Sequence, residues 1–432
     1  MPQRSTSLPA GGEPDARRRR DARAMAHDAR YVALDVPRGA TLAMDGAEFA
    51  CDADFAGVRS LPCGLHFVAF AAPASDAGGA GERVGEFVEC DDGVTHVRRW
   101  ESATESLGAG AGMGAEDAER AAAAAARGEL DRRMAVYPKE ASDTWTGLSC
   151  FIDRAGLRRC GIDCGTRIAP GDPDAESREA ETSGVMPYFD NIQRAPVFTR
   201  AAVSRAPRGM SPEEVSALNL DPEARLRHAL KCFGEDGWRG LLGEFQLAFV
   251  LLIGLSSMAA LEQWKHLAHV VCACAETAVF EYPELYSAFI DAISEQLKRA
   301  GDDFFVDDYS DENFLRPCLV ALMRIDISQA PETDMIDLDL QDKLFQISSK
   351  LERLDRDVLK KFDVHLSSEA HDAKLADADA AEEGEDAPVI VELSVSTYMA
   401  MNATRIDEND ENDTDVPTAA TTHGERMAWM VN

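Results

Sequence analysis

The strongest constraint on this fold is a pair of neighbouring segments, residues 243–255 and 261–271, that are each apolar on one broad helical face. In both segments apolar residues recur at intervals of three and four, which is the period of an α-helix. They are Phe245, Ala248, Phe249, Leu252 and Leu255 in the first segment and Leu261, Trp264, Leu267 and Val271 in the second. A helix with so wide an apolar face has to pack against partners. The second half of the chain is therefore predicted to contain a helical core.

Helix boundaries around this core carry local signals. Ser211-Pro-Glu-Glu offers an N-cap serine, a proline at the first helical position and a glutamate at the third, and Asp221-Pro-Glu repeats that pattern. Tyr282-Pro-Glu opens a further helix, which should end near Arg299 and Gly301, with a cation in the last turn and glycine beyond it.

A heptad pattern predicts one more long helix. Its apolar residues alternate spacings of four and three, and they are Leu340, Leu344, Ile347, Leu351, Leu354 and Val358. Such a seam suits either a coiled coil or the last helix of an intramolecular bundle. We favour the bundle, and the separate coiled coil is the alternative.

The first half of the chain has the two-residue period of β-strands instead. Alternating apolar residues begin at Tyr31, and Asp45-Gly46 between two such runs predicts a hairpin with a primed turn. A later pair of strand-like runs flanks Asp92-Gly93, which predicts a second hairpin of the same kind.

Shifts in composition divide the chain into five parts. Residues 1–28 are predicted to be a disordered N-terminal arm, 29–165 a β-rich domain of sandwich or barrel type, and 166–210 a connector rich in proline, glycine and charge. Residues 211–366 are predicted to form a helical domain, and 367–432 an acidic tail. The predicted fold class is α+β multidomain, with an N-terminal β-rich domain and a C-terminal all-α domain.

The net charge of −33 over 432 residues argues against direct binding to nucleic-acid phosphates, which normally requires a basic patch. We expect a protein partner and no tight binding to nucleic acid. No membrane association is expected either, because the apolar run Leu247 to Leu255 is shorter than the roughly 20 residues of a membrane span. Ten cysteines without a disulfide framework indicate reduced, mostly buried thiols in a cytosolic or nuclear protein.

Four residues near the core have ligand-type side chains: His266, His269, Cys272 and Cys274. Zinc sites use such groups, but on a helix with ~100° per residue these four point in different directions. We therefore predict core packing and no bound metal.

Other candidate sites lack a necessary part. Cys160 and Cys164 have no second cysteine pair, and the glycine-rich stretch 108–114 has neither a Walker lysine nor the expected βαβ setting. The acidic residues around Phe304 and Phe305 favour an apolar anchor, and 407–413 lacks the central glycine of a calcium loop. No catalytic residue, cofactor or metal is predicted, so we expect a protein that is not an enzyme.

The tail contains one isolated β-branched segment, residues 387–393. A lone strand needs a sheet to pair with, either in its own domain or in a partner. The predicted partner-binding residues are Pro388, Val389, Ile390, Val391, Glu392 and Leu393.

Several longer motifs occur in a particular order along the chain. They are Asp35-Val-Pro-Arg-Gly, Phe55-Ala-Gly-Val, Leu61-Pro-Cys-Gly-Leu-His-Phe, Val97-Arg-Arg-Trp, Arg159-Cys-Gly-Ile-Asp-Cys, Gly243-Glu-Phe-Gln-Leu-Ala-Phe-Val, Leu261-Glu-Gln-Trp-Lys-His-Leu and Asp302-Asp-Phe-Phe-Val-Asp. This ordered set, within residues 30–365, resembles the A1-cistron splicing factor family, which is of Aar type. That family consists of assembly chaperones for the U5 snRNP of the spliceosome.

The resemblance implies a β-rich domain followed by a helical domain similar to VHS domains. It also implies binding to the RNase H-like and Jab/MPN domains of the large U5 scaffold protein, which delays binding of the spliceosomal RNA helicase. Residues 387–393 look like the family's tail strand, which would bind by β-augmentation. We expect a monomer before complex formation, located in the cytoplasm and nucleus.

Two features depart from the family pattern, namely the basic N-terminal arm and the acidic extension that runs on to Asn432. The predicted function is that of a non-enzymatic splicing factor. An enzyme, such as a hydrolase of unknown substrate, and a direct RNA-binding factor are the alternatives.

Overall fold

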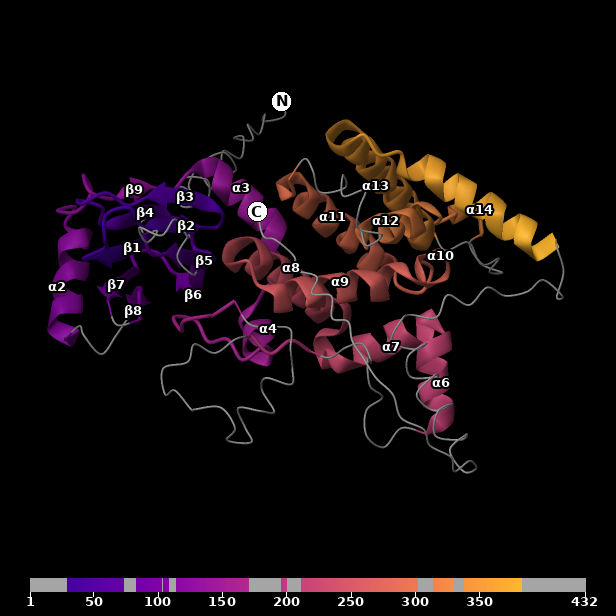
Figure 1. The fold of residues 1–432 in the computed structure, drawn as a ribbon, viewed down its shortest axis with the longest axis horizontal. Coiled ribbons are helices and arrows are strands. Elements are labelled where there is room, and N and C mark those ends of the chain that lie inside the picture. The colour runs from indigo at the N-terminus through magenta and orange to yellow at the C-terminus, as the bar shows by residue number, and fades with distance from the viewer. Residues whose placement is uncertain are drawn as a thin grey trace, which may run out of the picture. The chain divides into compact units, whose positions relative to one another are not determined.

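The structure is a computed structural model of the chain, shown in Figure 1. It describes residues 29–73, 83–102, 104–108, 114–170, 196–199, 211–301, 314–329 and 338–382. The chain divides into two compact units, residues 1–374 and 375–432. Only the end of one helix is described in the second unit, so the account below concerns the first.

The strands of the described chain form two sheets. One has the strand order β8-β7-β1-β4-β9, and the other has the order β3-β2-β5-β6. Their bounds are β1 Ala29–Leu34, β2 Thr41–Met44, β3 Ala47–Ala50, β4 Gly57–Leu61, β5 Gly64–Ala71, β6 Arg83–Cys90, β7 Thr95–Glu101, β8 Ser106–Gly108 and β9 Ala135–Val136.

The two sheets pack face to face, which confirms the predicted β-rich sandwich. Apolar residues from both sheets, among them Tyr31, Leu42 and Phe70, form a core between them. Helix α2 (Ala115–Ala126) covers the outer face of the five-stranded sheet, where Val32 contributes to a separate cluster. The outer face of the four-stranded sheet packs through Phe67 against α3 (Lys139–Ser149), α4 (Arg154–Arg159) and the helical region.

The hairpin predicted at Asp45-Gly46 is confirmed. It joins β2 to β3, and both turn residues have positive φ, 53° and 83°, as a primed turn requires. The hairpin predicted at Asp92-Gly93 is wrong. β6 pairs with β5, whereas β7 pairs in parallel with β1 in the other sheet. A turn is present there, since Gly93 has φ 75°. However, the chain passes at this turn from one sheet to the other, so the two flanking strands do not pair with each other.

The second half of the chain is helical, as predicted. The helices are α6 Pro212–Leu220, α7 Pro222–Cys232, α8 Gly237–Leu255, α9 Met258–Cys272, α10 Ala275–Ala278, α11 Pro283–Arg299, α12 Leu315–Met323, α13 Leu338–Phe362 and α14 Leu366–Glu382, with short 3-10 turns at Gly234–Asp236 and Ile327–Gln329. Both predicted core helices are confirmed as α8 and α9, and the Asp221 side chain caps α7 by accepting from the Glu223 amide.

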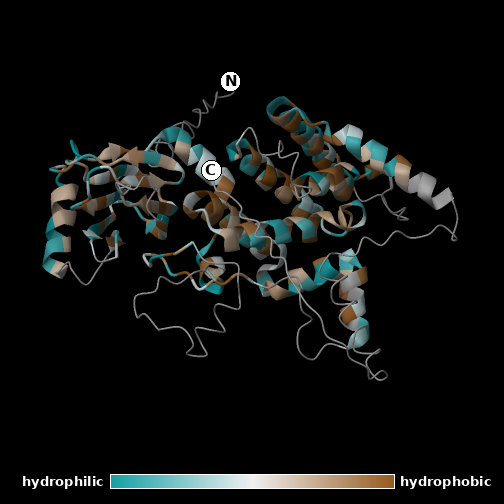
Figure 2. Ribbon diagram, in the orientation of Figure 1, coloured by the Kyte–Doolittle hydropathy of each residue, from teal (hydrophilic) through white to brown (hydrophobic). Residues whose placement is uncertain are grey.

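Helix α8 lies at the centre of the unit, and Figure 2 shows its hydrophobic composition. The apolar run Leu247–Leu255 is part of this 19-residue helix, which by length and composition is apolar enough to cross a membrane. However, 72% of its most apolar window is buried within the fold, as in a core helix. At Gly254 an added Cβ would collide with the Phe67 ring, so glycine permits the close approach of α8 to β5.

The heptad seam forms the inner face of α13, and Figure 1 shows this helix beside α11. Leu344, Ile347, Leu351, Leu354 and Val358 are buried in the main helical cluster, which confirms the bundle interpretation. Cations on α13 bind polar groups of α11 outside the seam. Lys350 Nζ, for example, donates to the Ser287 hydroxyl at 2.7 Å and to Asp291 Oδ2 at 2.5 Å.

The acidic tail predicted from residue 367 begins as helix α14. Its first turns pack on the bundle, since Leu366 and Ala370 are buried and Glu369 accepts bonds from Arg316 at 2.6 and 2.9 Å.

Replacing Lys361 with methionine is expected to lower the free energy of unfolding by about 1–2 kcal/mol. The Lys361 ammonium donates to the carbonyls of Leu297, Lys298 and Ala300 at the carboxyl end of α11, where helix carbonyls lack intrahelical donors. Urea denaturation measures the effect. Methionine at Lys360, an exposed neighbour, is the matched control and should change stability by less than about 0.5 kcal/mol. Equal effects of the two variants would contradict this role.

Candidate functional site

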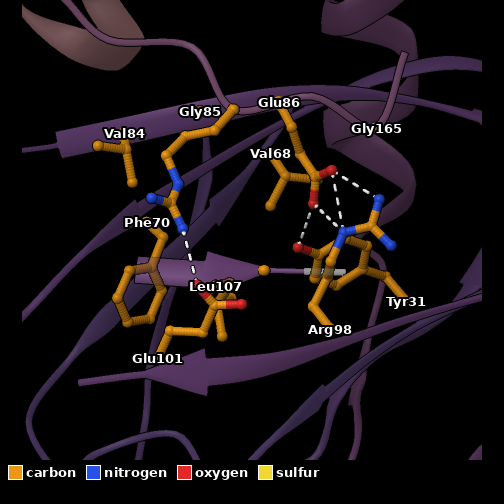
Figure 3. Close-up of a pocket in the computed structure, with 12 residues that line it drawn as sticks. Tyr31, Val68, Phe70, Val84, Gly85, Glu86, Arg98, Glu101, Leu107 and Gly165 are labelled. Atoms are coloured by element: carbon orange, nitrogen blue, oxygen red, sulfur yellow. Dashed lines mark hydrogen bonds and ion pairs between the residues drawn. The ribbon is translucent and has the colours of Figure 1, made fainter. Parts of the chain in front are cut away.

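A cavity of about 430 Å³ opens between the two sheets (Figure 3). Apolar side chains such as Phe70 line part of its wall. Its polar lining comes from Tyr31 on β1, Glu86 on β6, Arg98 and Glu101 on β7, and Arg167, which follows α4 and lies 3.5 Å from Glu101. Tyr31 lies 55 positions from Glu86, and the two meet because the two sheets face each other.

Glu86 and Arg98 form a bidentate ion pair inside this cavity. Arg98 Nε lies 2.8 and 3.0 Å from the two Glu86 oxygens, and Arg98 Nη2 lies 2.7 Å from Oε2. Both side chains are 9% exposed. The Tyr31 hydroxyl donates to Glu86 Oε1 at 2.7 Å, and burial together with the Glu86 charge raises the pKa of this phenol well above its usual value.

The chemistry of this cluster is that of a structural tie. The two charges neutralise each other, the phenol stays protonated, and every strong acceptor of Glu86 has a donor. An acid or base for catalysis needs a pKa near the working pH and a free position toward a substrate. Here the pKa of the Tyr31 phenol is raised well above its usual value, and both Glu86 oxygens already accept hydrogen bonds.

A second buried cluster is built on the β2–β3 turn. The Asp45 carboxylate accepts from the Phe67 amide at 2.9 Å and from the Tyr137 hydroxyl at 2.6 Å, and its Oδ2 lies 2.6 Å from His66 Nδ1. The other ring nitrogen of His66 lies 2.8 Å from the Pro62 carbonyl oxygen. Since both partners of the ring are acceptors, they favour the doubly protonated imidazolium. The Asp–His pair is therefore a support for the turn, with no ring nitrogen left to activate a nucleophile.

A third cluster joins the β-rich and helical regions through two buried polar residues of α8. Glu244 accepts from the Thr199 amide at 2.6 Å, the Thr199 hydroxyl at 2.7 Å and Gln263 Nε2 at 2.9 Å. Gln246 accepts from the Phe151 amide at 2.8 Å and donates to the Gly147 carbonyl at 3.1 Å. Burial raises the pKa of Glu244, although its bonds to Thr199 oppose that shift. We call Glu244 and Gln246 the α8 clasp.

The four ligand-type residues of the core are only partly brought together. Cys274 packs near the Tyr286 hydroxyl, with 3.7 Å between Sγ and Oη. Cys272 and His269 converge instead on Cys318 of α12, which sequence reasoning did not connect to them. Hydrogen bonds from Cys272 and His269 lower the pKa of Cys318, whereas burial raises that of Cys272. Within the described residues, no group of three or more His, Cys, Asp or Glu side chains is arranged to hold a metal ion.

The other predicted residues have different outcomes. All ten cysteines are free thiols, and six of them are buried, whereas Cys63, Cys150 and Cys232 are exposed and Cys164 is half-buried. The predicted tail segment Pro388 to Leu393, the acidic run 407–413 and the Phe304–Phe305 segment lie outside the described residues.

Comparison with protein families decides the relationship of this chain. A model for the AAR2 N-terminal domain matches residues 27–161, and a model for the AAR2 C-terminal repeat region matches residues 198–367. The chain belongs to the AAR2 family. This confirms the resemblance found in the sequence.

Similar proteins named "Protein AAR2 homolog" come from mammals and a nematode. The mouse protein is 25% identical over 84% of this chain and 94% of its own length, and the human protein is 26% identical with the same coverage. The Caenorhabditis elegans protein is 27% identical over 67% of this chain and 84% of its own length. These names designate no enzyme activity.

The two AAR2 matches meet at the α8 clasp. The N-terminal match includes Phe151 and Gly147, and the C-terminal match begins at residue 198, one residue before Thr199. Thr199 lies in the predicted connector, but the structure binds it to Glu244 at the centre of the unit. The α8 clasp therefore joins the two matched regions, residues 27–161 and 198–367, within one compact unit.

Proposed function

We propose that this protein is a non-enzymatic pre-mRNA splicing factor that assists assembly of the U5 snRNP. It binds the RNase H-like and Jab/MPN domains of the large U5 scaffold protein and delays binding of the RNA helicase. AAR2 proteins are splicing-related factors, and the observation that carries the proposal is that AAR2 matches extend over both the β-rich and the helical regions. The protein acts as a monomer before it joins the complex, in the cytoplasm and nucleus.

The fold supports an assembly role in physical terms. The sandwich and the helices are held by buried polar bonds of the α8 clasp, so both present their surfaces from one body. A rigid body loses little conformational entropy on binding a partner, which favours affinity. The tail segment 387–393 then adds main-chain hydrogen bonds through β-augmentation.

Replacing Ile390 with proline is expected to weaken binding to the paired scaffold domains at least about tenfold, which corresponds to roughly 1.4 kcal/mol. Proline removes a backbone donor that an added strand needs. Calorimetric titration with the purified RNase H-like and Jab/MPN domains measures the effect, and Val391→Pro should behave alike. The melting temperature should stay unchanged, because the segment lies beyond both family matches.

Proline at Asn412, in the acidic extension, is the matched control and should leave affinity unchanged. Wild-type affinity of the Ile390 and Val391 variants, or a large drop in their melting temperature, would show that the strand does not dock on the partner. Absence of binding by the wild-type protein would refute the proposed function itself.

The two alternatives make different predictions. An enzyme needs convergent reactive groups, but the buried charges found between the sheets and at the β2–β3 turn are already paired. An RNA-binding factor should bind U5 RNA with submicromolar affinity that falls steeply with salt. Filter binding across a salt series therefore separates it from the scaffold-binding proposal.

A further inference from the structure

A groove lies where the β2–β3 turn, α3 and the ends of α8 and α11 meet. Its apolar part has a volume of about 190 Å³ and is lined by Phe67, Trp145, Leu148, Val250 and Ile253. Ile253 is 37% exposed although it belongs to the mostly buried helix α8. A neighbouring hollow of about 240 Å³, lined by Pro138, Ala141 and Thr144, shares three residues with the first: Asp45, Gly46 and Arg299. The two hollows thus form one groove with Arg299 at its middle.

Arg299 is placed on this groove by a close contact. Its Nη2 donates to the Gly46 carbonyl at 3.3 Å, and a Cβ at Gly46 would collide with the same guanidinium. The hairpin glycine therefore does two things. It permits the positive φ of the turn, and it leaves room for the arginine to lie across it.

Among the described residues, the carboxylates around the groove are engaged elsewhere and none pairs with Arg299. Asp45 is engaged by His66 and Tyr137, and Glu48 is paired with Arg83 at 3.2 Å. Within the part of the chain that the structure describes, no carboxylate lies within 4.0 Å of the Arg299 guanidinium. Glu140 lines the second hollow, but within the described residues it forms no ion pair with Arg299. A guanidinium beside an apolar hollow suits a ligand that carries both a carboxylate and an apolar side chain.

The neighbouring strand indicates the form of the ligand. In the described residues β3 (Ala47–Ala50) pairs only with β2, so its outer edge is open beside the groove. Glu48 and Ala47 of this strand line the two hollows. An open edge favours an extended chain, because main-chain groups can pair along it.

We propose that this groove docks an extended segment of a partner protein in which a glutamate or aspartate adjoins an apolar residue. The carboxylate binds Arg299, and the apolar side chain enters the hollow beside Trp145 and Ile253. This contact adds to the tail strand of the proposed function but does not depend on it.

The peptide acetyl-Ser-Leu-Glu-Val-amide is a direct probe of this chemistry, and acetyl-Ser-Leu-Gln-Val-amide is its uncharged match. The full-length protein carries five tryptophans, which can be labelled with 5-fluorotryptophan and followed by fluorine NMR. The Trp145→Phe variant assigns the relevant signal. We expect the glutamate peptide to shift the Trp145 signal in a saturable way, and the glutamine peptide to bind about fivefold to tenfold more weakly.

Variants of the protein test the same contact from the other side. Arg299→Gln should weaken binding of the glutamate peptide by about the same factor and leave the affinity for the glutamine peptide unchanged. Glu140→Gln removes a negative charge that lines the groove and repels the peptide carboxylate, so it should strengthen binding of the glutamate peptide about twofold. Lys298→Gln is the control, because Lys298 is the adjacent cation but is paired with Glu295.

Several results would overturn the proposal. One is equal affinity for the two peptides, and another is an Arg299→Gln variant that binds as the wild type does. A Trp145 signal that moves without peptide when Glu392 or Leu393 is changed to serine would assign the groove to this chain's own tail. No scaffold domain is present in these titrations, so a negative result would contradict the groove proposal but not the proposed function. Conversely, absence of scaffold binding would contradict the proposed function but not the groove proposal.

Discussion

Replacing Arg98 with methionine is expected to lower the free energy of unfolding by about 3–5 kcal/mol, a large part of the stability of a typical domain. The substitution leaves the Glu86 carboxylate between the sheets with the Tyr31 hydroxyl as its one remaining side-chain donor among the described residues. A buried charge without its counter-ion costs several kcal/mol, and the bidentate geometry makes this loss larger than that of a single hydrogen bond. Urea denaturation followed by tryptophan fluorescence measures the change.

Arg99 provides the matched control, because it is the next residue on β7 and pairs with Asp35 at the surface, 3.0 Å away. Arg99→Met should cost less than about 1 kcal/mol. Adding Glu86→Gln to Arg98→Met removes the orphaned charge and should recover part of the lost stability. If the single Arg98 variant were as stable as the Arg99 variant, the ion pair would not hold the two sheets together.

Replacing Asp45 with asparagine is expected to lower the free energy of unfolding by about 2–4 kcal/mol. Asparagine tolerates the positive φ of the turn, so the change isolates the carboxylate from the backbone requirement. The variant loses the charge that holds His66 and weakens the acceptor of the Tyr137 hydroxyl. Asp92→Asn, in the turn between β6 and β7, is an exposed control and should have little effect.

The same cluster makes stability depend on pH in a defined direction. Burial lowers the pKa of His66, but its bond to Asp45, the Asp45 charge and the Pro62 carbonyl together raise it above the ordinary histidine value. A raised pKa means that the folded state binds the proton more tightly than the unfolded state does. The contribution is therefore complete below the unfolded pKa of about 6.5 and is lost as pH rises through the folded value.

We expect the wild-type protein to lose this part of its stability as the pH rises above about 6.5, and the Asp45→Asn variant to lose much less over the same range. Denaturation at a series of pH values tests the difference between the two proteins. Parallel pH profiles would show that His66 is not charged by its contact with Asp45.

Features that depend on neighbouring residues could be predicted from the sequence. The helical period of residues 245–271 placed α8 and α9, the heptad seam placed α13, and Asp45-Gly46 placed the first hairpin. These signals are local, because helix faces and tight turns are set by residues within a few positions of one another. The order of longer motifs also led to the correct family.

Features that depend on distant partners were decided by the tertiary structure. A two-residue period identifies a strand but not its neighbour, so the parallel pairing of β7 with β1 could not be read from Asp92-Gly93. For the same reason the Tyr31–Glu86 bond, which joins residues 55 positions apart, and the meeting of Cys272 with Cys318 left no local trace.

The sequence by itself therefore determined the two kinds of domain, the main helices, one turn and the family, because short-range periodicity and motif order encode them. Only the tertiary structure decided which charges are buried together, how Glu244 binds Thr199 of the predicted connector, and where Arg299 faces a groove. Burial is the physical reason. The sequence does not show whether a carboxylate is solvated or paired with a guanidinium, because the packing of distant elements determines its surroundings.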